Sequence, residues 1–139
     1  MKTKRILLAA FVCFFVVTQA VAQQTANIKT DKLIWTINQA QDRQTLQTKN
    51  EAYALITAAD RIELTFGQSS RKFDIVEITG EWNDPTLTGE LTYTIKFGDK
   101  VGKGILTKSN GAITFILDFS AYKGGLNQKY FITEYKKSL

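Results

Sequence analysis

The chain contains no histidine and only one cysteine among its 139 residues. That residue, Cys13, lies in an apolar N-terminal stretch that we expect to be removed. Ser-His-Asp and Cys-His catalysis and the usual zinc sites all require one of these two side chains. No EF-hand loop and no glycine-rich phosphate loop is present either. The composition therefore predicts no disulfide, no metal site and no cofactor.

Proline occurs once, as Pro85, and the sequence has no low-complexity segment and no internal repeat. Linkers between domains are commonly rich in proline, glycine and polar residues. None is visible here, so we expect residues 23–139 to form a single domain. This length is sufficient for one modest hydrophobic core.

The N-terminal segment has the layout of a secretory signal peptide. Lys2, Lys4 and Arg5 precede an apolar run over 6–17, and the small residues AVA follow. The run is shorter than the roughly 20 residues that a transmembrane helix needs. We expect cleavage after Ala22 and a secreted or periplasmic protein with no membrane anchor. A signal peptide at 1–22 would account for most of the formal charge of +5, because its loss removes three basic residues and leaves +2. The remaining Lys and Arg are scattered, which argues against nucleic-acid binding.

Alternation of apolar and polar residues dominates the rest of the sequence. This period of two is typical of half-buried antiparallel strands. It is clear over 61–66, 90–97 and 112–119 and weaker over 33–38, 71–79 and 129–135. Both faces of 71–79 carry apolar residues, which indicates a central strand or a bulge. The predicted fold is mainly β: an antiparallel β-sandwich or a small β-barrel built from hairpins, with at most one or two short helices.

Residues 40–60 allow two interpretations. Asn50 as an N-cap, followed by a glutamate and several alanines, slightly favours a short helix. Alternatively, Tyr53, Leu55 and Thr57 form one face of a strand.

Two hairpin turns predict a register in the middle of the chain. Gly98-Asp99 suits a type II′ turn, and Asn110-Gly111 suits a type I′ turn. Together they put two glycines of the central strand on the inward face, opposite large apolar side chains. Either neighbours such as Tyr93 and Phe119 fold over the bare backbone, which we favour, or the trough is a pocket for an apolar ligand. In the second case the ligand-binding residues are Tyr93, Ile95, Gly102, Gly104, Leu117 and Phe119.

A second candidate site follows at Trp82, Asn83 and Asp84. A buried Trp82 would anchor the core, which we favour, whereas an exposed ring could stack on a sugar held by the neighbouring amide and acid. The surrounding segment 78–93, with Gly80-x-Trp82, resembles the opening strands of avidin and lipocalin barrels. In those families Gly-x-Trp opens the first strand, whereas here it lies in mid-chain, and we infer no ligand from the resemblance.

The remaining enzymatic option is a pair of carboxylates. If residues 67–70 form a four-residue loop, Glu63 and Asp74 oppose each other on the outer face. Arg61 and Lys72 lie diagonally beside them, so a solvated charge ladder is favoured over a glycosidase pair. We therefore expect an exported, non-enzymatic β-domain that binds an apolar small molecule, a glycan or a protein partner. The alternative is a structural or inhibitor-like protein that acts through an exposed surface.

Overall fold

The computed structural model describes residues 26–138, so the predicted signal peptide lies outside the described residues. Every regular element in this range is a strand, and no described segment forms a helix able to span a membrane. The strands are β1 (Leu33–Asp42), β2 (Thr48–Lys49), β3 (Tyr53–Thr57), β4 (Arg61–Phe66), β5 (Ser69–Thr79), β6 (Gly89–Phe97), β7 (Lys100–Ser109), β8 (Ala112–Asp118) and β9 (Asn127–Lys137).

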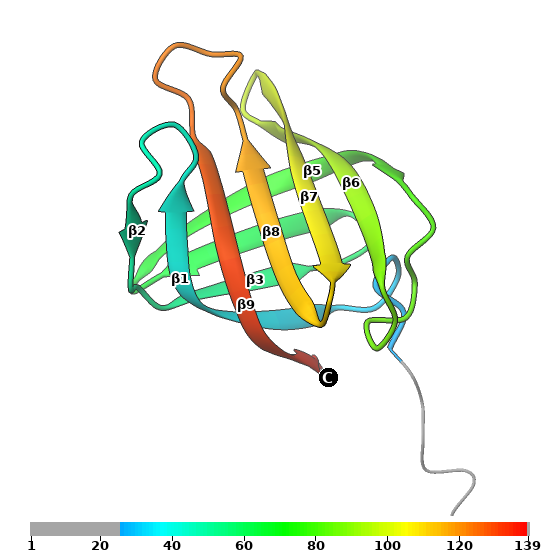
Figure 1. Ribbon diagram of the computed structural model, residues 1–139. Helices are drawn as coiled ribbons and strands as arrows, with labels where there is room; N and C mark the ends of the chain where they lie inside the picture. The colour runs from blue at the N-terminus through cyan, green and yellow to red at the C-terminus, as the bar shows by residue number, and fades with distance from the viewer. Residues whose placement is uncertain (1–25, 139) are drawn as a thin grey trace, which may run out of the picture.

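The strands form a closed antiparallel barrel. From β3 to β9 each strand pairs with its neighbour in the chain, and β1 pairs with both β3 and β9 (Figure 1). Eight strands thus close the barrel, and the short β2 is an extra strand beside the end of β1. The mainly β prediction is confirmed, and of its two architectures the barrel is the one observed.

The helix favoured within 40–60 is wrong. This segment contains β2 and β3, and β3 uses the face that the alternative interpretation gave it, with Leu55 and Thr57 buried. Leu55 lies opposite Trp35 of β1, and Thr57 accepts a hydrogen bond from the Trp35 indole at 2.9 Å. These contacts outweigh the weak helix propensity of the alanines, because propensity differs by less than about 1 kcal/mol per residue.

The register predicted for the middle of the chain is confirmed. Tyr93 lies opposite Gly104 and Ile95 opposite Gly102, while Gly104 also faces Leu117 of β8. Gly98 has a φ of 64°, as the first position of a type II′ turn requires. Asn110 and Gly111 have φ values of 52° and 79°, as a type I′ turn requires.

The turn between β4 and β5 differs from the prediction. Phe66 pairs with Ser69, so the loop is the two residues Gly67-Gln68 rather than four. Glu63 consequently lies opposite Lys72, and Asp74 lies opposite Arg61. Gly67 adopts a φ of 58°, which makes the tighter turn accessible. The two acids therefore face opposite charges and not each other. The bulge predicted in β5 is confirmed after Ile75.

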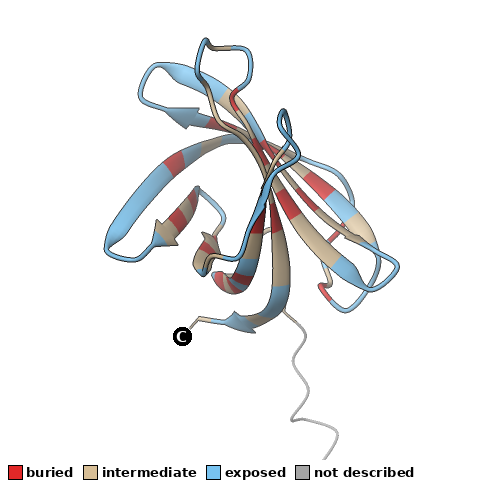
Figure 2. Cartoon of the chain, turned by 60° about the vertical axis from the view of Figure 1, so that its left-hand side comes forward, coloured by how far each residue is buried: buried red, intermediate tan, exposed pale blue. Residues whose placement is uncertain are grey.

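Large side chains fill most of the barrel interior. Figure 2 shows buried bands across the strands and exposed loops at their ends. The largest fully buried side chains include Trp35, Tyr93, Phe73 and Phe115, and none of them is more than 2% exposed. Such a barrel is a packed core and not a pore.

One end of the barrel is closed by the N-terminal turn and the β5–β6 loop, at the lower right of Figure 1. Ile28 is fully buried, and its backbone N–H donates to the Asn83 carbonyl at 2.8 Å. Trp82 from the loop packs against Trp35 with ring centroids 6.3 Å apart. The two segments therefore form one apolar plug.

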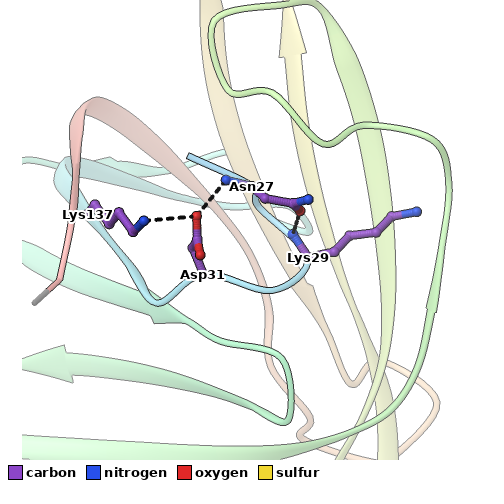
Figure 3. A network of polar contacts seen from close by, with 4 residues as sticks. All are labelled: Asn27, Lys29, Asp31 and Lys137. Carbon is purple, nitrogen blue, oxygen red and sulfur yellow. Dashed lines mark hydrogen bonds and ion pairs between the residues drawn. The ribbon is translucent and has the colours of Figure 1, made fainter. Parts of the chain in front are cut away.

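Polar contacts fix this plug to the last strand. Asp31 accepts a hydrogen bond from the Asn27 N–H at 2.8 Å and lies 3.5 Å from the ammonium of Lys137 (Figure 3). The Lys29 N–H donates to the Asn27 side chain at 3.0 Å. These contacts tie the N-terminal turn to β9 and keep Ile28 inserted.

Gly104→Val is expected to destabilise the protein by about 1–3 kcal/mol. A Cβ at this position would lie 2.9 Å from the ring of the fully buried Phe115, which has no free space to move into. Chemical denaturation of the variant measures the effect. Lys103→Val, on the outer face of the same strand, is the control and should change stability little. A Gly104→Val midpoint equal to that of the control would contradict the packing described.

Candidate functional site

The end of the barrel opposite the plug contains a cavity of about 490 Å³, which we call the mouth cavity. It lies among the ends of β1 and β4, the starts of β3, β5 and β9, and the connection that carries β2. Its lining combines apolar, aromatic, neutral polar and charged side chains: Ala40, Asp42, Thr45, Gln47, Lys49, Glu51, Tyr53, Leu64, Phe66, Ser69, Arg71, Leu126, Gln128 and Tyr130.

The floor of the mouth cavity is apolar and aromatic. Leu64 and Tyr130 are only 7% and 4% exposed, and Ala40 is buried beside them. Tyr53 stacks on Phe66 with ring centroids 4.8 Å apart and meets Tyr130 edge-on at 5.2 Å. Such a surface packs well against the ring or chain of a ligand.

The two carboxylates in the lining are engaged by the protein itself. Asp42 Oδ1 accepts hydrogen bonds from the backbone N–H groups of Gln44 and Thr45 at 2.8 and 3.1 Å, and Oδ2 accepts one from Gln128 at 3.3 Å. The backbone bond from Thr45, with that from Gln44, lowers the pKa of Asp42. Glu51 accepts a hydrogen bond from the Tyr53 hydroxyl. Burial, followed by this bond, raises the pKa of Tyr53.

Arg71 brings a positive charge to the same cavity. It is the third residue of β5 and lies opposite Leu64, on the inward face. Within residues 26–138 its guanidinium forms no hydrogen bond and no ion pair. Burial raises the pKa of Tyr130 to about 12, and the charge of Arg71 acts against this rise by favouring the phenolate. The positive potential of Arg71 therefore reaches the cavity floor.

A second cavity of about 250 Å³ lies on the other side of Arg71, and we call it the phenylalanine cavity. Phe73 is central to it, with ring centroids 5.4 Å from Phe97 and 5.7 Å from Phe119. The remaining lining consists of Arg71, Lys100, Gly124, Gly125 and Leu126. Arg71 and Leu126 thus belong to both cavities, and the lining of the second contains two cations and no carboxylate.

Aromatic rings occupy the space beside the two glycines of β7. A Cβ at Gly102 would lie 2.7 Å from the ring of Phe119, and one at Gly104 would lie 2.9 Å from the ring of Phe115. Aromatic side chains therefore fold over the glycines, as the favoured interpretation predicts. Phe119 covers Gly102 as predicted, whereas Phe115 and not Tyr93 covers Gly104. Of the six candidate residues around the trough, Phe119 lines the phenylalanine cavity and neither cavity includes the others: Tyr93, Ile95, Gly102, Gly104 and Leu117. Ligand binding there stays a prediction without a cavity to support it.

The second predicted site lies at the closed end, on the β5–β6 loop. Trp82 is 3% exposed, and its indole N–H donates to the carbonyls of Asp84 and Leu87 at 2.8 and 2.9 Å. The Asp84 carboxylate accepts from the backbone and hydroxyl of Thr86. Asn83 is exposed, and its carbonyl holds Ile28. Trp82 is therefore the core anchor that we favoured, and its ring face is not open for stacking on a sugar.

The residues that build the two cavities differ from those that the sequence pointed to. Arg71, Tyr53 and Tyr130 come from three separate strands and meet only because the barrel closes. One signal was available for Arg71: strand alternation puts it on the same face as Phe73, so a charge falls on the inward side of an apolar strand.

The described residues contain no group of three or more His, Cys, Asp or Glu side chains that could hold a metal ion. Comparison of the chain with protein-family models, with curated proteins and with solved structures gave no match. Function must therefore be argued from the geometry of the open end.

Tyr93→Phe is expected to preserve stability or raise it by up to about 1 kcal/mol. The Tyr93 hydroxyl is buried and has no hydrogen-bond partner within residues 26–138, so its removal relieves a desolvated polar group. Tyr53→Phe is the matched control, and it should lower stability because it deletes the bond to Glu51. Thermal denaturation compares the two. A loss on Tyr93→Phe would reveal a partner for the hydroxyl.

Asp42→Asn is expected to destabilise the protein at neutral pH. The folded state lowers the pKa of Asp42 below 3.8, so the charge contributes stability above that pH and loses it as the pH falls through the folded pKa. The difference between variant and wild type should therefore shrink in acid. Denaturation midpoints at neutral pH and below pH 3.8 measure it. If the difference in midpoint between Asp42→Asn and wild type does not change with pH, the loss comes from altered hydrogen bonding or packing and not from the charge of Asp42.

Proposed function

We propose that the protein is an exported, non-enzymatic binding protein that holds a small amphipathic molecule at the open end of its barrel. The observation that carries this proposal is the contrast between the two ends. One end is sealed by Ile28, Trp35 and Trp82, whereas the other carries a cavity of about 490 Å³. Small-molecule sites commonly measure about 300–1,000 Å³.

The lining of the mouth cavity favours an amphipathic ligand over a purely apolar one. Tyr53, Phe66 and Tyr130 offer aromatic surface for an apolar body. Polar side chains at the rim, among them Gln47, Ser69 and Gln128, offer hydrogen bonds for a polar head. A few placed polar groups over an apolar floor are typical of sites that orient a ligand.

Binding without catalysis agrees with the chemistry of the described residues. A general acid at neutral pH needs a raised carboxyl pKa. Asp42, at the rim, has a lowered pKa, held by backbone hydrogen bonds. Export rests on the signal-peptide layout of the first 22 residues and is part of the proposal.

The uncharged fluorescent probe N-phenyl-1-naphthylamine tests this function, because its emission rises when it enters an apolar site. We expect saturable binding to the mature protein. Ala40→Phe should abolish it, since the larger side chain fills the cavity floor from β1. Ala112→Phe, an exposed position at the closed end, is the control and should bind the probe normally.

Both variants must first be shown to unfold cooperatively, so that loss of binding is not loss of fold. Absence of saturable binding to the wild-type protein would overturn the proposal. Equal binding by Ala40→Phe and wild type would remove the mouth cavity as its site.

A further inference from the structure

We propose that the ligand of the open end is an amphipathic organic anion and that Arg71 is the residue that recognises its negative charge. This inference rests on the proposed function and adds the chemical class of the ligand to it. The relevant groups are carboxylate, sulfonate and phosphate, whose oxygens match the planar fork of a guanidinium.

The position of Arg71 is the first argument. Its neighbour across the sheet is Leu64, which is 7% exposed, so the strand alternation directs Arg71 toward the barrel interior. It lines both the mouth cavity and the phenylalanine cavity. A ligand in either cavity therefore meets the same guanidinium.

The state of the neighbouring acids is the second argument. Asp42 already accepts three hydrogen bonds, and Glu51 accepts one from Tyr53. The one ion pair formed within residues 26–138, between Asp31 and Lys137, lies at the closed end. The charge of Arg71 is thus not neutralised by the protein, and its electrostatic influence on Tyr130 points the same way.

The phenylalanine cavity supplies the third argument. A group beside Arg71 on this side meets Phe73, Phe97 and Phe119 together with the cation of Lys100, and the lining contains no acid. Arg71 and Lys100 are exposed, so an anionic group can reach both cations while the apolar part of the molecule packs against the rings. Rings beside cations and away from carboxylates are complementary to a molecule with an apolar body and an anionic head.

Charge is distributed unevenly between the two ends. The segments at the open end are 42–51, 66–72, 96–100 and 118–129, and they carry eight Lys and Arg against four Asp and Glu. The rest of the predicted mature chain carries seven Lys and Arg against nine Asp and Glu. The modest positive charge of the protein is therefore concentrated in the segments at the open end, and three of these cations, Lys49, Arg71 and Lys100, line the two cavities.

A matched pair of probes tests the inference. 8-Anilinonaphthalene-1-sulfonate has the ring system of N-phenyl-1-naphthylamine plus one sulfonate, so the difference in affinity isolates the negative charge. We expect the wild-type protein to bind the sulfonate more tightly, with a preference that falls as salt rises. Arg71→Gln should weaken sulfonate binding by about tenfold and leave the uncharged probe unaffected.

Lys72→Gln is the control variant. Lys72 is adjacent in the chain and loses the same charge, but it lies on the outer face opposite Glu63, so it should leave the affinities for both probes unchanged. An equal loss in both variants would assign the effect to overall charge and overturn the role of Arg71.

The outcomes separate this inference from the proposed function. If neither probe binds the wild-type protein, the binding function itself fails. If the uncharged probe binds and Arg71→Gln leaves sulfonate affinity unchanged, binding stands and the anion inference fails. A further arm distinguishes the source of the anion: flotation with phosphatidylglycerol vesicles that depends on Arg71 indicates a lipid headgroup, whereas sulfonate binding without flotation indicates a free molecule.

Discussion

The pairing of β1 with β9 is the interaction on which the rest of the structure depends. It joins the first and last strands of the barrel from Leu33–Lys137 to Asp42–Gln128. Closure assigns an inner and an outer face to each strand of the barrel, and it places side chains that are far apart in the sequence around one interior. The same strand also determines where the barrel opens. On the edge of β1 away from β9, β3 pairs with β1 only up to Ile37, and beyond it only the short β2 lies along that edge. The mouth cavity occupies the region where β3 has diverged.

The volume of the interior explains why the cavity lies at one end only. Two glycines on β7 make room for the rings of Phe115 and Phe119, and Trp35 with Tyr93 fills the layers below. The plug around Ile28 and Trp82 then covers the base. This packing also buries the Tyr93 hydroxyl, which has no hydrogen-bond partner among the described residues and therefore opposes folding. A packed base provides a rigid floor, which reduces the ordering that a ligand at the mouth must bring about.

The parts of this fold that the sequence predicts are those with strong local signals. Alternation and the turn residues at Gly98 and Asn110 give the correct register for three strands, because each turn constrains its hairpin on its own. The two errors occur where local signals are weak. Residues 40–60 have helix-favouring alanines that β1 pairing overrides, and Gly67-Gln68 lacks the Asn-Gly signature that would have marked a two-residue turn.

The candidate site was harder to predict for a different reason. The glycine trough is a local feature of one hairpin pair, and it proved to be core. The open end is built from residues 40 to 130, and nothing local shows that Ala40 and Tyr130 are paired neighbours. Only the inward register of Arg71 beside Phe73 could have drawn attention to it, and a single inward charge at a strand end is also compatible with a solvated rim.

The inner side chains change from apolar to polar at one common level. Moving toward the open end, Phe73 gives way to Arg71, Tyr130 to Gln128, and Ala40 to Asp42. A solvated barrel end needs no more than such a change, because water can satisfy every polar group there. The arrangement goes further in two respects. Its acids are held by backbone N–H groups and by Tyr53, while the cation between two aromatic cavities is left without a partner in the described chain. Asp42 and Glu51 line the same cavity as Arg71, yet neither forms an ion pair with it in the described chain. An end in which the negative charges are satisfied and the positive charge is not has an electrostatic preference, and that preference is for an anion.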